Sequence, residues 1–163
     1  MMELLAFGDT GWGDELLLSM VMTILVSTSS LAFGLVIGTI FASFKLSNSY
    51  ILKAIAEFYT TVVRGVPELL VIYLLFFGGS GAVMYVAKIF GHMGYIELSP
   101  FTIGTIAVGA ISGAYSTEVI RGAILAVPKG QFEAAKTLGM AKYAMSFKVI
   151  FPQVARLALP GIG

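Results

Sequence analysis

Several residue types are missing or rare in this sequence of 163 residues. It has no cysteine and a single histidine, His92, which excludes disulfide bonds, thiolate metal sites and a histidine metal cluster. The formal net charge is +1, so electrostatics give no reason to expect a nucleic-acid partner. No GxxxxGK[ST] phosphate-binding motif is present. We therefore expect neither a bound cofactor nor ATP hydrolysis by this chain.

Charged residues are also scarce. They make up 12% of the chain, whereas a soluble domain carries about 25%, and hydrophobic residues make up 58%. This leaves too little polar surface to cover a water-soluble globule, so we expect the lipid bilayer to surround much of the chain. The first 15 residues carry four acidic and no basic residues, which is unlike a secretory signal peptide.

Long uncharged stretches predict membrane-spanning helices, each of which needs about 20 apolar residues. Residues 16–44 and 69–87 carry no charge, and residues 101–125 carry only two. A fourth span is expected to begin near residue 154. Because a chain rarely stops inside a span, we expect the sequence to continue beyond Gly163. The whole chain is then one transmembrane domain.

Two pairs of glycines lie four residues apart within the predicted spans, Gly34 with Gly38 and Gly109 with Gly113. Such pairs let two helices approach closely. They predict either an interface with another subunit or tight packing inside the bundle.

Residues 45–64 are more polar and hold Lys53 and Glu57 one helical turn apart. They predict a cytoplasmic turn followed by a short amphipathic helix at the membrane face. Orientation follows from the basic residues, because cytoplasmic loops are rich in lysine and arginine. With the N-terminus outside, only Lys88 falls outside and seven basic residues fall inside. The seven are Lys45, Lys53, Arg64, Lys129, Lys136, Lys142 and Lys148.

Residues 126–152 predict a helix–glycine–helix on the cytoplasmic side. A new helix is expected around Glu133, because a carboxylate suits a helix N-terminus. The two alanines that follow carry almost no side chain, so this face can press against another protein. Gly139 interrupts the helix, and Pro152 is expected to end the second short helix before the next span. The segment is shaped to dock, although a solvated surface helix shows the same pattern.

The spacing of this segment is similar to the EAA loop of the permease subunits of ATP-binding-cassette (ABC) importers. That loop has Glu-Ala-Ala, a glycine after three further residues, a β-branched residue after nine more, and then x-(Leu/Phe)-Pro. The matching residues are Glu133, Ala134, Ala135, Gly139, Val149, Phe151 and Pro152. The departures from the general pattern, valine for isoleucine and phenylalanine for leucine, are mild.

Residues 63–70 and 114–122 resemble one branch of this family, the polar amino acid permeases of the histidine/glutamine type. The likeness is greatest to permeases of the histidine, arginine and opine kind, and it extends over essentially the whole chain. It implies an all-α transmembrane bundle with a cytoplasmic coupling helix, five spans and an external N-terminus, in the bacterial inner membrane.

The resemblance also implies function and partners. Residues 126–152 would dock on a cytoplasmic ATP-binding subunit, which hydrolyses ATP in place of this chain. A second permease subunit, either a homologous chain or a copy of this one, would complete the pathway. An extracytoplasmic solute-binding protein would deliver the solute. The expected function is the uptake of polar or basic amino acids or opines.

Four charged residues in or near the spans are candidate functional residues. Glu118 and Arg121 lie one helical turn apart inside a span, where ionisable side chains are usually functional. They are expected either to line the solute path or to form a structural ion pair. Glu57 and Arg64 are expected either to support the docking segment or to be solvated.

Three other functions fit parts of the sequence. An ABC importer for another class of solute fits the docking segment equally well. A secondary transporter driven by an ion gradient needs no ATPase, but it leaves the pattern from Glu133 to Pro152 unexplained. A membrane scaffold without transport activity does not need a charge such as Glu118 inside a span.

Overall fold

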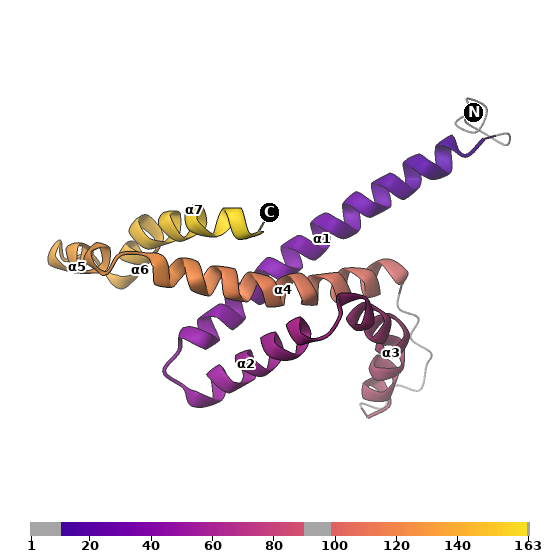
Figure 1. Ribbon diagram of the computed structural model, residues 1–163, viewed down its shortest axis with the longest axis horizontal. Coiled ribbons are helices and arrows are strands. Elements are labelled where there is room, and N and C mark those ends of the chain that lie inside the picture. The colour runs from indigo at the N-terminus through magenta and orange to yellow at the C-terminus, as the bar shows by residue number, and fades with distance from the viewer. Residues whose placement is uncertain (1–10, 90–98, 163) are drawn as a thin grey trace.

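In the computed structural model the described residues, 11–89 and 99–162, form helices and connecting turns without a strand (Figure 1). The predicted all-α fold is therefore confirmed. His92 and the connecting segment around it lie outside the described residues, as do the first two acidic residues of the N-terminus. The helices are α1 (Gly13–Leu46), α2 (Tyr50–Gly65), α3 (Glu68–Ile89), α4 (Pro100–Ala126), α5 (Lys129–Thr137), α6 (Lys142–Met145), the π-helical turn η2 (Ser146–Ile150) and α7 (Phe151–Ile162).

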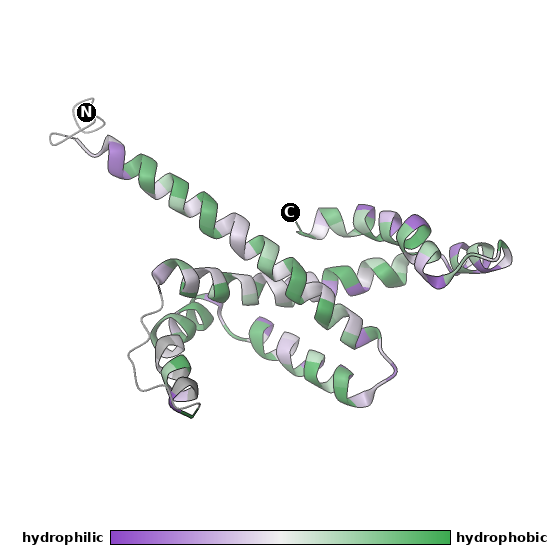
Figure 2. Cartoon of the chain, turned by 180° about the vertical axis from the view of Figure 1, so that it is seen from behind, coloured by the Kyte–Doolittle hydropathy of each residue, from purple (hydrophilic) through white to green (hydrophobic). Residues whose placement is uncertain are grey.

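Three described helices are long and apolar enough to cross a membrane: α1, the Glu68–Tyr85 part of α3, and α4. At about 1.5 Å per residue, the 34 residues of α1 extend about 51 Å. Because the hydrocarbon core of a bilayer is about 30 Å thick, α1 is longer than one crossing requires. Figure 2 shows apolar residues along most of α1 and hydrophilic residues at its N-terminal end.

Local sequence explains where α4 begins. The Ser99 side chain accepts a hydrogen bond from the Thr102 backbone N–H at 3.2 Å, which satisfies one of the free donors of the first turn. Pro100 occupies the first helical position, where the missing N–H of proline costs nothing.

The crossing of α1 and α4 is the tightest contact in the fold. A Cβ atom built on Gly38 would lie 2.6 Å from the Ser116 Cβ, and one on Gly34 would lie 2.8 Å from the Ser112 Oγ. Gly109 faces Phe33 of α1 in the same way, at 2.6 Å. The glycine pairs of the two helices therefore pack against each other's helix inside one chain, where small residues allow the backbones to meet.

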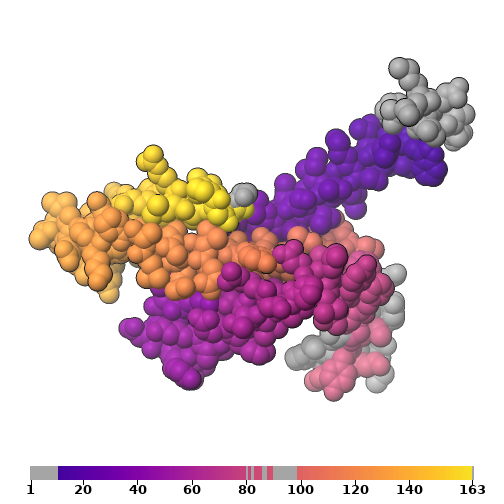
Figure 3. All heavy atoms as spheres, viewed as in Figure 1, coloured from indigo at the N-terminus to yellow at the C-terminus, as the bar shows by residue number. Residues whose placement is uncertain are grey.

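The helix α2 lies where the sequence predicted a short helix, and its place at the membrane face stays a prediction. It packs against α1 and α4 (Figure 3). Tyr59 stacks on Phe41 of α1, with ring centroids 4.4 Å apart, and its hydroxyl donates to the Ala110 carbonyl of α4. The outer side of α2 exposes large apolar side chains such as Ile51 and Phe58. An apolar outer side suits lipid or another subunit better than water.

The C-terminal helix α7 packs on the last turns of α4. The contact is a cluster of buried side chains, here called the α4–α7 cluster: Ala123, Val127, Ile150, Val154 and Ala158. Pro152 was expected to end a helix, but the helical path continues through it into α7. A proline ring clashes with the carbonyl four residues earlier. The π-helical turn directly before Pro152 changes the hydrogen-bond register there, which explains why the helix is not broken.

We predict that Gly38→Ala lowers the free energy of unfolding by about 1–3 kcal/mol, the usual cost of overpacking, because the added methyl group meets Ser116. The matched control is Gly104→Ala in α4, where no atom lies within 4 Å of the added carbon. This control should be neutral or stabilising, because alanine favours a helix by about 1 kcal/mol over glycine. Chemical unfolding in detergent micelles measures both. Equal stability of the two variants would contradict the close crossing.

Candidate functional site: an exposed helical loop and a buried ion network

The helical loop, residues 126–152, extends from the end of α4 (Figure 1). In α5, Glu133 and Ala134 are exposed, whereas Ala135 is buried. The exposed part of the Glu-Ala-Ala motif is thus one carboxylate and one methyl group. Such a surface has small side-chain volume and one negative charge.

Gly139 closes α5 with the backbone geometry of a Schellman cap. Its φ angle is +68°, a left-handed conformation that glycine adopts without steric cost. The Met140 N–H donates to the Ala135 carbonyl at 3.1 Å, and the Gly139 N–H donates to the Lys136 carbonyl at 2.9 Å. These bonds satisfy two carbonyls that a helix end otherwise leaves free. The helix is therefore interrupted at Gly139 as predicted, with a capped end.

The loop is fixed to the helices behind it. Phe132 of α5 and Val149 of η2 pack against the α4–α7 cluster. The Gln153 side chain of α7 donates to the Gln131 side chain of α5 at 3.3 Å. These contacts join α5 to α4 and α7.

An exposed row of aromatic rings follows Gly139. Tyr143, Phe147 and Phe151 are 80%, 62% and 61% exposed, and successive ring centroids lie 5.5 and 6.3 Å apart. Pro152 next to this row is also exposed. These rings therefore form an apolar stripe that points outward, away from the α4–α7 cluster.

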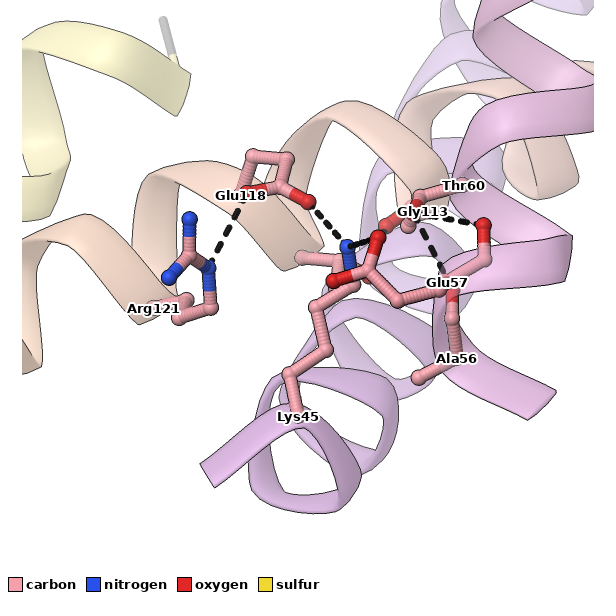
Figure 4. Close-up of polar contacts among 8 residues, drawn as sticks. Lys45, Ala56, Glu57, Thr60, Gly113, Glu118 and Arg121 are labelled. Carbon is pink, nitrogen blue, oxygen red and sulfur yellow. Dashed lines mark hydrogen bonds and ion pairs between the residues drawn. The ribbon is translucent and has the colours of Figure 1, made fainter. Parts of the chain in front are cut away.

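A network of charges around the buried Lys45 joins three helices (Figure 4). The Lys45 Nζ of α1 lies 3.0 Å from the Glu57 Oε2 of α2 and also pairs with the Glu118 Oε1 of α4. The Arg121 Nε lies 3.1 Å from the other oxygen of Glu118. The Lys45 side chain is only 4% exposed, whereas those of Glu57 and Arg121 are 64% and 39% exposed. The buried lysine thus has carboxylate partners, as a buried charge requires.

Hydroxyl groups around the network are satisfied within their own helices. Thr60 donates to the Ala56 carbonyl at 3.0 Å, and Thr117 donates to the Gly113 carbonyl at 2.7 Å (Figure 4). Both threonines are almost fully buried. This bonding allows hydroxyl groups to lie in the contact between α2 and α4 without a free donor.

Three of the four charged candidates, Glu57, Arg64 and Glu118, line one cleft between α2 and α4. Glu118 and Arg121 form an ion pair, and Glu57 joins them through Lys45. The Arg64 guanidinium lies 5.3 Å from the centre of the Tyr115 ring of α4. Glu57 therefore contacts α1 and Arg64 contacts α4. Both residues lie far from α5 in the sequence.

Sequence reasoning missed Lys45. It lies at the end of a long uncharged stretch, which is the usual place for a lysine that reaches the membrane surface. Its partner Glu118 is 73 residues away in the chain, and no periodicity links two such positions. Only the close crossing of α1 and α4 brings them together.

Comparison with known proteins places these features in context. The family described as binding-protein-dependent transport system inner membrane component matches residues 34–163. The nopaline transport system permease protein NocQ of Agrobacterium fabrum is 50% identical over 99% of this chain and 69% of its own length. The histidine/lysine/arginine/ornithine transport system permease protein HisQ of Escherichia coli is 40% identical over 94% of this chain and 67% of its own length.

A solved structure has the same fold. It is a crystal structure of an amino acid ABC transporter with histidines, and it superposes with a TM-score of 0.66 at 32% sequence identity. The match covers 87% of this chain and 61% of that chain. The chain thus spans about three fifths of the solved transporter chain.

We predict that Lys45→Met lowers the free energy of unfolding by about 3 kcal/mol, the lower end of the cost of leaving one member of a buried ion pair alone. The lower end applies because Glu118 keeps Arg121. Lys53→Met, which removes an exposed lysine from α2, is the control and should have almost no effect.

The double variant Lys45→Met/Glu118→Gln should recover more than half of this loss, because the carboxylate that lost Lys45 is gone. Unfolding in detergent micelles gives the free energies of Lys45→Met, of Glu118→Gln and of the double variant. Simple additivity of the two single changes would contradict a direct interaction between Lys45 and Glu118.

Proposed function

The chain belongs to the family of binding-protein-dependent transport system inner membrane components, and from this membership we propose that it is the permease subunit of an ATP-driven importer of amino acids or opines. The relatives are named as permeases for nopaline, for octopine and for histidine, lysine, arginine and ornithine. These names support a polar or basic amino acid, or an opine, as the solute. The chain holds no phosphate-binding motif, so the ATP is hydrolysed by a separate subunit.

The observation that carries the proposal is the exposed Glu133–Ala134 surface on a short, rigidly capped helix. We propose that α5 fits a cleft on a cytoplasmic ATP-binding subunit, with Gly139 setting the angle at which the loop returns to the membrane. Phe132 and the α4–α7 cluster then pass the motion of α5 to the spans. Only a difference in contacts between the two conformations of the transporter can shift their equilibrium. In this proposal, ATP binding to the partner subunit creates that difference.

The same proposal sets the orientation and the other partners. With the N-terminus outside the inner membrane, the basic residues around α5 and α6 lie in the cytoplasm, as the excess of lysine and arginine there requires. A second permease subunit, homologous or identical, packs on the apolar outer surface of the bundle. A solute-binding protein delivers the solute from the opposite side, and the family description fits such a partner.

Of the two roles expected for Glu118 and Arg121, their contacts favour the structural one. Both oxygens of Glu118 have cationic partners, Lys45 and Arg121, so this carboxylate has little capacity left for a solute. We propose that it holds α1, α2 and α4 together while α4 moves.

We predict that a cysteine introduced as Ala134→Cys forms a disulfide with a cysteine in the cleft of the ATP-binding subunit, and that ATP changes its yield. The chain has no native cysteine, so the crosslink is unambiguous. The matched control is the neighbouring Ala135→Cys, which is 3% exposed and should give little product. Non-reducing gel electrophoresis of co-expressed membranes measures both. If Ala134→Cys gives no product while both subunits are folded in the membrane, α5 is not the docking surface.

A further inference from the structure

The helices that follow Gly139 carry cations without carboxylate partners. No aspartate or glutamate follows Glu133 in the sequence. Lys142, Lys148 and Arg156 are exposed, and the described part of the chain gives none of them an ion-pair partner. The surface from α6 to α7 is therefore positively charged and is open to an anionic partner.

These cations flank the exposed aromatic row. Each lysine is next in the sequence to a ring of the row, Lys142 to Tyr143 and Lys148 to Phe147. Arg156 lies one helical turn after the exposed Pro152, and long side chains on a helix point back toward its N-terminus. The three rings and the three cations are called the aromatic–basic face: Lys142, Tyr143, Phe147, Lys148, Phe151 and Arg156.

The aromatic–basic face lies at the level where a membrane span ends. Ile150 packs with Ala123 and Val127 in the α4–α7 cluster, and these two residues belong to the last turn and the cap of α4. Because α4 is long and apolar enough to cross the membrane, its end marks a membrane–water boundary. Aromatic rings are enriched at such a boundary, and lysine and arginine extend from it toward the lipid headgroups.

The composition of this face fits lipid better than protein. Aromatic residues are common in protein interfaces, but lysine is depleted there, and a lysine stands at each of two rings of this row. Basic residues beside a membrane are attracted by anionic lipids. The surface proposed for the ATP-binding subunit, Glu133 and Ala134, lies on α5, on the other side of the turn at Gly139.

We propose that the aromatic–basic face binds anionic phospholipids in the leaflet that surrounds this end of α4. The rings lie among the upper parts of the acyl chains, and the three cations bind the phosphate groups. This partner is independent of the solute that the permease carries. Because the face follows α5 directly, the bound lipid holds the returning helix at the membrane surface while α5 remains free to contact a partner subunit.

The test is fluorescence quenching in the complete transporter, assembled with cysteine-free partner subunits and reconstituted in phosphatidylcholine vesicles. A bimane label is attached to Phe147→Cys, which is then the only cysteine of the chain. The quencher is a nitroxide near the top of an acyl chain, carried either by anionic phosphatidylglycerol or by zwitterionic phosphatidylcholine. The ratio of the two quenching efficiencies gives the lipid preference at the label. Solute uptake by the labelled vesicles shows that the complex is assembled, and Tyr143→Cys provides a second position for the label.

The label should prefer phosphatidylglycerol by more than about tenfold at low salt, and added salt should reduce this preference by screening. Lys148→Gln should lower the preference about fivefold, the effect of one basic residue near an anionic surface, whereas Lys148→Arg should keep it. The matched control is Lys53→Gln, which removes an exposed lysine from α2. Because α2 and α7 lie on opposite sides of α4 (Figure 1), this control should leave the preference unchanged.

Three results would overturn this assignment. A label that neither lipid quenches is covered by protein, such as the ATP-binding subunit or a second permease chain. Equal quenching by the two lipids means that the rings contact lipid without recognition of the headgroup. An equal loss of preference in Lys53→Gln and Lys148→Gln means that only the total charge matters. The proposed function is decided separately, by ATP-driven uptake in the same vesicles.

Discussion

The close crossing of α1 and α4 is the contact on which the other features depend. Gly38 and Gly34 leave no room for a side chain against Ser116 and Ser112, so the two backbones meet directly. Without large side chains between the helices, the end of α1 reaches α4, and Lys45 reaches Glu118. A wider spacing would separate this pair and leave a charged lysine in an apolar environment, which is costly.

The helix α4 carries all three functional features in order. Tyr115 forms a wall of the cleft, Glu118 and Arg121 belong to the ion network, and Val127 belongs to the α4–α7 cluster that supports α5. Val127 lies 12 positions after Tyr115, a rise of about 18 Å, and it is the cap residue at the end of α4. The ion network lies between the cleft and the α4–α7 cluster and joins α1 and α2 to α4.

Sequence reasoning was most successful where a pattern is local. The uncharged stretches, the α4 helix and the left-handed turn at Gly139 all follow from neighbours within a few residues, and the structure has helices and a cap at those positions. For α2 it predicted the helix, but a mixed polar and apolar pattern fits a membrane surface and a helix packed on α1 and α4 equally well. It failed at Pro152, because the π-helical turn that accommodates this proline has no signature in composition.

The sequence by itself determined that this is a helical membrane protein with a helix–glycine–helix segment, because hydropathy and motif spacing act over short distances along the chain. Only the tertiary structure decided which charges share an environment. Lys45, Glu57 and Glu118 come from three helices, and their pairing depends on how closely glycine and serine let those helices approach. The cleft beside Arg64 arises in the same way, because it lies between α2 and α4 and belongs to neither helix alone.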